Sequence, residues 1–273
     1  MATVNAAKCY GLRHIGAIAP GYQADIVVLD DLCSMNVSEV FFKGKKAGGN
    51  ELDKRRECPS GLKHTIHLEN YSKECLKLPL QGKRAHVIQM EEGQITTKDL
   101  VCQVPGEKEF EADQEFNKIA VIERHKGTGR TGVGILSGFG LRGGAIASSV
   151  SHDSHNIIVV GDNDADMELA VNELVRTQGG YTIVENGAVS MTLALPIMGL
   201  MSDAGYENVN ATLKKMLAKA HQMGVPKGME PFITLSFMAL PVIPQLRITP
   251  RGLFSVSEFC LLDTIRNGED NGN

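Results

Sequence analysis

Two histidines and an aspartate lie directly ahead of an apolar run in this sequence. The stretch His-Asp-Ser-His-Asn forms residues 152–156, and the apolar residues 157–160 follow it. Imidazole titrates near neutral pH and a neighbouring carboxylate can orient it, so His152, Asp153 and His155 have the chemistry to exchange protons with a substrate. Two imidazoles can also bind a divalent metal ion, so His152 and His155 are candidates for a metal site.

The spacing of the two histidines sets a condition on the backbone. Side chains three positions apart on a strand face opposite ways, so His152 and His155 meet one ligand only if the chain turns between them. Ser154 and Asn156 favour such a turn, and both can bind a substrate through hydrogen bonds. The alternative is that these polar residues only satisfy main-chain groups of a loop ahead of a buried strand.

A second polar motif spans residues 122–130, Ile-Glu-Arg-His-Lys-Gly-Thr-Gly-Arg. It follows an apolar strand-like run and can present an acid, a base and anion-binding groups at one edge of a sheet. Glu123 and His125 are therefore further candidates for substrate binding. The alternative is a solvated charged loop, which is the commoner role of such a stretch.

Composition excludes several classes of function. The 273 residues carry a net charge of −4 with scattered basic residues, which argues against a nucleic-acid ligand. The most apolar windows, residues 187–201 and 232–246, are shorter than the ~20 residues of a membrane span and contain proline. Six widely spaced cysteines predict reduced thiols in a cytoplasmic protein. The glycines of residues 138–144 precede no clear helix, so we expect no dinucleotide site.

Runs of apolar residues predict the strands that carry these motifs. We expect strands over residues 84–90, 95–104 and 117–124, with a turn at residues 91–93 between the first two. The glycine-rich run 132–150 predicts irregular strands or close approach of backbones.

Two helices and a hairpin are expected after the second histidine. Asp162 and Asn163 are capping residues, and helical spacing continues to a left-handed stop at Gly179. The dipeptide at 186–187, Asn-Gly, predicts a two-residue hairpin turn. A second helix is expected over residues 206–223, whereas the tail ending the chain is expected to be disordered.

The order of these elements predicts two domains and a mixed fold. Residues 1–60 read as the end of a helix followed by small β units, and the charged stretch 48–63 as a linker or loop. Residues 61–273 read as a larger domain of mixed α/β or α+β class, because strands, helix, hairpin and helix follow one another.

Several motifs together resemble a known family. Residues 5–32 carry Gly-x-Ile-x-Pro-Gly-x-x-Ala-Asp-Ile-Val-Val, a pattern of the amidohydrolase superfamily. Four more stretches resemble the domain that distinguishes adenine deaminases within that superfamily, and they are VIERHKGTG, GFGLRGGAIASSVSHDSHNIIVVGDND, LPIMGLMSD and FITLSFMALPVIPQLRITPRGLF. The chain therefore resembles the C-terminal portion of a bacterial-type adenine deaminase.

The resemblance implies a fold and an activity. Residues 1–60 would be the end of the last barrel helix and part of a composite β-sandwich, and residues 61–273 a C-terminal α/β domain with a mixed sheet. The activity would be hydrolysis of adenine to hypoxanthine and ammonia by a metal-activated hydroxide. Manganese or iron would occupy barrel sites whose ligands lie before residue 1, and this chain would lack those ligands.

The resemblance also raises the weight of the polar motifs. His152, Asp153 and His155 would act as substrate-side or proton-handling groups that complete or cap the pocket of the missing N-terminal barrel. By itself the chain would be inactive. The alternative from a different class is a non-catalytic scaffold or oligomerisation module, with a homo-oligomer formed through apolar segments near residues 195–201 and 232–244.

Overall fold

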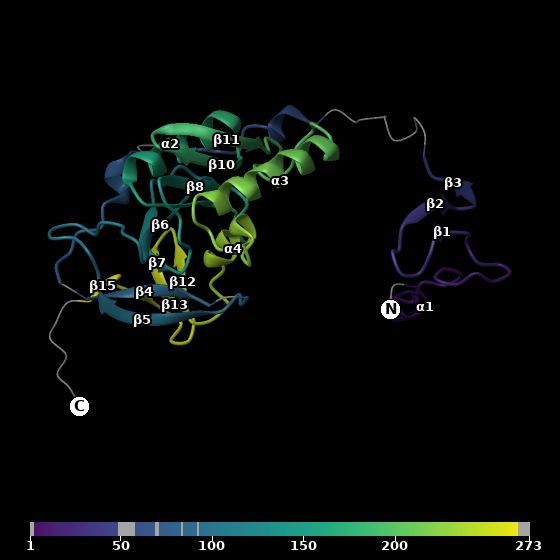
Figure 1. Cartoon of the computed structure of the whole chain (residues 1–273), viewed down its shortest axis with the longest axis horizontal. Helices are drawn as coiled ribbons and strands as arrows, with labels where there is room; N and C mark the ends of the chain where they lie inside the picture. Colours follow the sequence, from purple (N-terminus) through teal and green to yellow (C-terminus); the bar gives the residue numbers. More distant parts are fainter. Residues whose placement is uncertain (1–2, 49–57, 69–70, 83, 92, 267–273) are drawn as a thin grey trace. The chain divides into compact units, whose positions relative to one another are not determined.

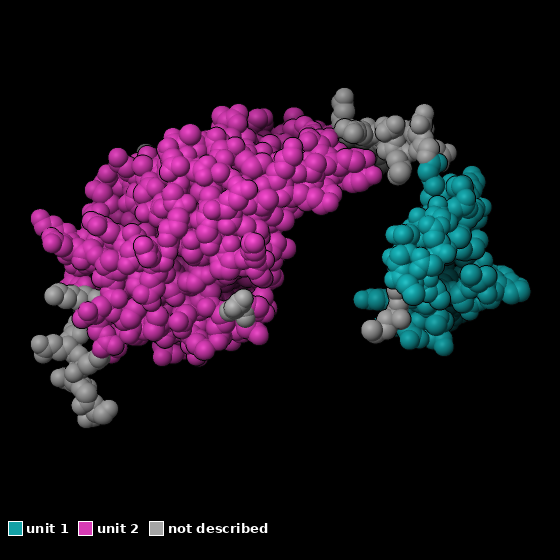
Figure 2. Space-filling view, viewed as in Figure 1, with its two compact units in different colours: residues 1–57 teal, residues 58–273 magenta. Residues whose placement is uncertain are grey.

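The computed structural model divides the chain into two compact units, residues 1–57 and residues 58–273 (Figure 2). The residues that it describes are 3–48, 58–68, 71–82, 84–91 and 93–266. Most of the predicted linker, the middle of the predicted turn at 91–93 and the predicted disordered tail lie outside the described residues.

Unit 1 consists of one short helix and a three-stranded antiparallel sheet. Helix α1 spans Val4–Cys9, and the strands pair in the order β1 (Ile26–Leu29), β2 (Val37–Phe42) and β3 (Lys45–Lys46). The turn between β2 and β3 is made by two residues with positive φ, Lys43 and Gly44.

Unit 1 has almost no core of its own. Among its described residues only Ala7 is buried, whereas the strand residues Val27, Val28, Val37 and Phe42 are all exposed. A strand sequence rich in Val and Phe normally has at least one covered face. The sheet of unit 1 therefore presents apolar side chains that its own residues do not cover.

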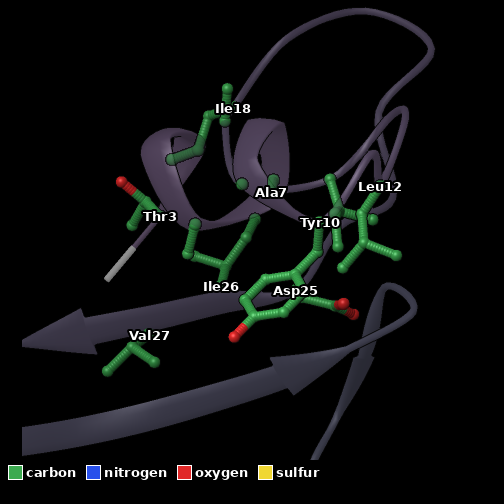
Figure 3. A pocket seen from close by; sticks show the side chains of 12 residues that line it. Thr3, Ala7, Tyr10, Leu12, Ile18, Asp25, Ile26 and Val27 are labelled. Carbon is green, nitrogen blue, oxygen red and sulfur yellow. The ribbon is translucent and has the colours of Figure 1, made fainter. Parts of the chain in front are cut away.

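An open hollow of about 610 Å³ lies between the helix and the first strand of unit 1. Figure 3 shows the side chains of Tyr10 and Ile26 in the space between α1 and β1. The residues that line this hollow are mostly apolar, as are the exposed side chains of the sheet.

Nine strands of unit 2 form one mixed sheet (Figure 1). Their order is β11-β10-β8-β9-β6-β7-β4-β15, with β5 paired to β4, and only β4 and β7 run parallel. Their bounds are β4 Arg84–Met90, β5 Thr97–Gln103, β6 Phe116–Ile122, β7 Thr131–Ser137, β8 Gly144–Ser148, β9 Ile157–Gly161, β10 Gly180–Glu185, β11 Ala188–Ala194 and β15 Ile265–Arg266.

Helices cover both faces of this sheet, which explains why its central strands are apolar throughout. In β6, Ile119 and Val121 belong to a core shared with α3 (Tyr206–Gln222) and α4 (Pro231–Met238). Ala120 and Ile122 point the other way, into a core with α2 (Asp164–Thr177). Successive side chains of a strand face opposite sides, so both sets are buried.

Smaller elements complete unit 2. A three-stranded antiparallel sheet adds its apolar side chains to the core on the side of α3 and α4. Two short 3-10 helices, η2 and η3, precede the large sheet. The bounds of these elements are β12 Leu246–Thr249, β13 Gly252–Ser255, β14 Cys260–Leu262, η2 Ser60–Leu62 and η3 Lys73–Leu76.

The structure confirms the first predicted helix, but the left-handed residue that ends it lies one position earlier than predicted. Asn163 caps α2 by accepting the main-chain N–H of Asp166 at 2.8 Å. The left-handed residue is Gln178, with φ of 58°, so the prediction that Gly179 has this role is wrong. Gln178 tolerates the conformation because its amide donates back to the carbonyl of Val175 at 2.9 Å.

Helix α4 was not predicted, because its sequence is apolar on all sides. Pro231 occupies its first turn, where the missing N–H is not needed, and the carboxylate of Glu230 accepts the main-chain N–H of Ile233. The capping pattern before the apolar run was the available signal.

Other expectations from the sequence are confirmed. The fold is a mixture of helices and a large mixed sheet, and Asn186 and Gly187 form the hairpin turn with φ of 49° and 80°. A Cβ at Gly132 would overlap the carbonyl oxygen of Thr249, so this glycine does permit close approach of two backbones. In the described part of the chain, no helix is long and apolar enough to span a membrane.

Candidate functional site

The HDSHN turn, residues 152–156, connects the buried strands β8 and β9. The main-chain N–H of His155 donates to the carbonyl of Ser151 at 2.6 Å, and His155 has a φ of 50°. This turn brings the rings of His152 and His155 together, with centroids 6.0 Å apart in an edge arrangement. The backbone therefore meets the condition under which both imidazoles can face one ligand.

Helix α4 supports the first histidine of the turn. The main-chain N–H of His152 donates to the carbonyl and the hydroxyl of Ser236, at 3.1 and 3.2 Å. The imidazole of His152 also packs against the ring of Phe237, with centroids 5.0 Å apart. The helix that sequence patterns did not predict thus supplies the wall against which His152 rests.

The second histidine has a defined tautomer when it is neutral. The main-chain N–H of Ser151 donates to Nδ1 of His155 at 3.3 Å, so Nδ1 carries a lone pair and Nε2 the proton. Burial lowers the pKa of His155, and electrostatic repulsion from His152 and Arg124 lowers it further, against the opposing effect of Asp153. Near neutral pH, His155 is accordingly an uncharged hydrogen-bond donor through Nε2.

Of the other polar residues of the turn, two are exposed to solvent and one is buried and holds the backbone. Asp153 and Ser154 are exposed. Asn156 is buried, donates from its amide to the hydroxyl of Ser154 at 3.0 Å, and accepts the main-chain N–H of Arg124 at 3.3 Å. Asn156 therefore has a structural role in holding the turn.

The loop of residues 123–130 lies beside the HDSHN turn. Nε2 of His125 bonds to the main-chain carbonyl of Ser154 at 2.7 Å. The two motifs are therefore brought together in one site by residues that lie 29 positions apart in the sequence.

The carboxylate of Glu123 is occupied by its own loop. It accepts main-chain N–H groups of His125, Lys126 and Thr128 at 2.6, 2.9 and 3.1 Å, and the hydroxyl of Thr128 at 2.9 Å. Burial raises the pKa of Glu123, but these hydrogen bonds outweigh it and lower the pKa to about 2. Glu123 thus shapes the loop, and its role in substrate binding stays a prediction.

Arg124 is the residue of this site that sequence reasoning did not single out. Its side chain is only 1% exposed, and its guanidinium donates to three main-chain carbonyls. Nε bonds to His155 at 2.5 Å, Nη1 to Thr65 at 3.0 Å and Nη2 to Met198 at 2.9 Å. The available signal was its position two residues after Ile122, where strand alternation points a side chain inward.

The role of His152 and His155 as an extra metal site stays a prediction, because no third ligand lies with them among the described residues. Structural and catalytic metal sites in proteins use three or four ligands from the side chains of His, Cys, Asp and Glu. Among the described residues no three such side chains are grouped to hold a metal ion. The residues present therefore do not fit the barrel metals that the resemblance implies.

Two family models match parts of this chain. Residues 94–260 match the model of the adenine deaminase C-terminal domain, and residues 1–47 match the amidohydrolase family. An adenine deaminase of Desulfitobacterium hafniense (strain Y51) is 50% identical over 259 residues, covering 94% of this chain and 46% of that protein.

Two further relatives are covered to a similar extent. An adenine deaminase of Nitratidesulfovibrio vulgaris (strain Hildenborough) is 45% identical over 95% of this chain and 46% of its own length. One of Clostridium acetobutylicum is 44% identical over 96% of this chain and 47% of its own length. The chain spans about half the length of the curated relatives it matches. This chain belongs to the adenine deaminase C-terminal domain family.

Proposed function

We propose that this chain is the C-terminal part of an adenine deaminase, which converts adenine and water to hypoxanthine and ammonia. The observation that carries the proposal is the domain match over residues 94–260, because it includes the 123–130 loop and the HDSHN turn. The relatives named adenine deaminase supply the substrate in this proposal.

In this proposal the HDSHN turn meets the substrate. Adenine presents ring nitrogens that accept hydrogen bonds, and the neutral His155 offers Nε2–H as a donor. His152 and Asp153 flank it as groups that can exchange protons, and His125 and Ser154 form the neighbouring edge. Covering the substrate would strengthen each of these polar contacts by excluding water.

The metal of the reaction would be held outside this chain. Membership of residues 1–47 in the amidohydrolase family suggests a metal cofactor, which would activate water. We propose manganese or iron, held by a barrel domain that this chain does not contain, and a cytoplasmic location, which six free cysteines support. What this chain supplies is substrate binding, orientation and exclusion of water.

A domain replacement tests the proposal. The 259-residue matching segment of the Desulfitobacterium hafniense relative is replaced by this chain, and ammonia release from adenine is measured. We expect the hybrid to be active and His155→Ala to lower kcat/KM by about 100-fold. The control is His64→Ala, which changes an exposed histidine outside the two motifs.

Two results would contradict the proposal. The first is a folded hybrid whose activity is unchanged by both His152→Ala and His155→Ala, which would leave the turn a structural role only. The second is ammonia release by this chain alone, because the metal-activated water would then have to come from within it.

A second function, assembly of the enzyme, is favoured by the exposure of unit 1. Val27, Val37 and Phe42 are 57%, 57% and 58% exposed, and no residue of the strands that carry them is buried. Such a sheet requires a covering partner. In the full enzyme, Val27→Thr with Phe42→Ser would then weaken assembly while leaving the fold of unit 2 intact, which calorimetry resolves.

The predicted homo-oligomer stays a proposal, but the apolar surface available for it is smaller than the two predicted segments suggested. Most apolar side chains of α4, including Phe232 and Leu235, are buried in the core of unit 2. The large apolar side chains that remain exposed in the two predicted segments are those of Met198, Met201, Ile233 and Val242. Light scattering of Met201→Ser with Val242→Ser tests them, since an unchanged mass would exclude this surface.

A further inference from the structure

The buried guanidinium of Arg124 joins three segments that are distant in the sequence. It donates to the main-chain carbonyls of Thr65, His155 and Met198, which lie 59, 31 and 74 positions away, and also to the hydroxyl of Thr65. A planar guanidinium with five N–H donors suits this arrangement, because one group can bond in several directions at once.

Among the described residues, no carboxylate lies within hydrogen-bonding distance of this cation. The carboxylate of the adjacent Glu123 is held by the N–H groups of its own loop instead. Burial lowers the pKa of Arg124 to about 10, opposed by the charge of Glu123, and the side chain stays protonated near neutral pH. A buried cation is costly unless its donors are satisfied, so the three carbonyls account for its stability there.

The contact with His155 is the one that bears on function. The carbonyl that Nε of Arg124 binds belongs to the same residue as the imidazole that faces His152. Three further contacts fix the same turn from other sides, namely Asn156 to the N–H of Arg124, His125 to Ser154, and Ser151 to Nδ1 of His155.

We propose that Arg124 is the positioning residue that holds the HDSHN turn against the segments at Thr65 and Met198 and thereby fixes the orientation and protonation of His155. Only the catalytic consequence of this inference rests on the proposed function. The three hydrogen bonds of the Arg124 guanidinium, here called the tether, are present in this chain by itself.

Replacing Arg124 with lysine or with glutamine separates the effect of its hydrogen bonds on the turn from the effect of its charge on His155. Arg124→Lys keeps the positive charge, but a single ammonium at the end of an unbranched chain cannot reach all three carbonyls. Arg124→Gln also removes the charge, which is one of several that act on the His155 imidazole, together with His152, His125 and Asp153.

A second buried arginine provides a matched control. Arg247 is 0% exposed, and its guanidinium also donates to main-chain carbonyls, those of Leu246 and Ile95, at 2.7 and 2.6 Å. Arg247→Lys therefore imposes the same kind of loss on unit 2 without touching the turn.

The full chain is studied by amide hydrogen exchange and by NMR titration of its histidine rings. We expect Arg124→Lys to speed exchange of the amides of residues 152–156 about tenfold, and Arg247→Lys to leave them unchanged. We expect Arg124→Gln to raise the pKa of His155. Unchanged exchange and titration in both Arg124 variants, or an equal effect of Arg247→Lys on the turn, would overturn the proposal.

A measurement on the unmodified chain tests the proposal even if the variants fail to fold. We expect the Nε–H proton of Arg124 to exchange slowly, because it is buried and hydrogen-bonded. Rapid exchange of this proton would overturn the proposal. In the domain-replacement enzyme, Arg124→Lys is expected to lower kcat more than it changes KM. An inactive replacement enzyme with the expected exchange and titration results would contradict the proposed function and still support the tether.

Discussion

The Nε2 atom of His125 lies 2.7 Å from the main-chain oxygen of Ser154. A carbonyl oxygen only accepts, so Nε2 carries the proton of this bond. The bond closes the 123–130 loop onto the HDSHN turn, and it does so through one of the candidate substrate-binding residues. The His125 side chain therefore helps to hold the two loops of the site together, in addition to any contact with substrate.

Replacing His125 with alanine should loosen the turn without unfolding the domain. The hydrogen bond is exposed, so we expect a loss of about 1 kcal/mol in the free energy of unfolding. Amide exchange should rise at residues 153–155 and stay unchanged in the core strands. His64→Ala is the control, and equal exchange in the two variants would show that the bond does not order the turn.

Glu123 should stabilise the protein in a pH-dependent way. Its pKa falls from an ordinary 4.5 to about 2 on folding, so its contribution is complete above pH 4.5 and is lost as the pH falls towards 2. Glu123→Gln should therefore lower the free energy of unfolding by about 1 kcal/mol near neutral pH, in keeping with its partly exposed position.

Urea unfolding at several pH values checks this prediction. The difference between the original protein and Glu123→Gln should shrink as the pH is lowered from about 5 to about 3. A difference that stays constant over this range would mean that the carboxylate is not held by its loop.

The elements of unit 2 were largely predictable because their signals are local. The Asn163 cap and the Asn186-Gly187 turn are decided by the residues themselves, and both are as expected. Strand order was not predictable, since β4 lies beside β7 and β15 through contacts between distant segments. Helix α4 was missed because apolar residues on all of its sides remove the periodic pattern on which helix prediction depends.

The site was predictable in its parts but not in its assembly. Spacing identified His152 and His155 and even the need for a turn between them, because side-chain direction on a strand follows a fixed rule. Nothing local indicated that Ser236 would hold the main chain of His152, or that Arg124 would bind carbonyls of three segments. Those contacts depend on tertiary packing, which a single sequence does not encode in any short pattern.

Removing divalent metal ions should leave the stability of this chain unchanged. Two imidazoles with no third ligand among the described residues bind metal weakly, and folding does not depend on such a site. Dialysis against EDTA should not shift the melting temperature, whereas in the domain-replacement enzyme it should abolish ammonia release. A lower melting temperature of the isolated chain after dialysis would point to a metal held within it.

Gly199 should tolerate alanine worse than Gly187, although both residues have positive φ, 72° and 80°. A Cβ at Gly187 meets nothing within 4 Å, so Gly187→Ala pays only for backbone strain, about 1 kcal/mol. A Cβ at Gly199 would lie 2.9 to 3.0 Å from the guanidinium of Arg124. That group cannot retreat without breaking its bonds to three carbonyls, so Gly199→Ala should cost about 1 to 3 kcal/mol more. Urea unfolding of both variants measures the difference, and equal losses would show that the guanidinium is free to move.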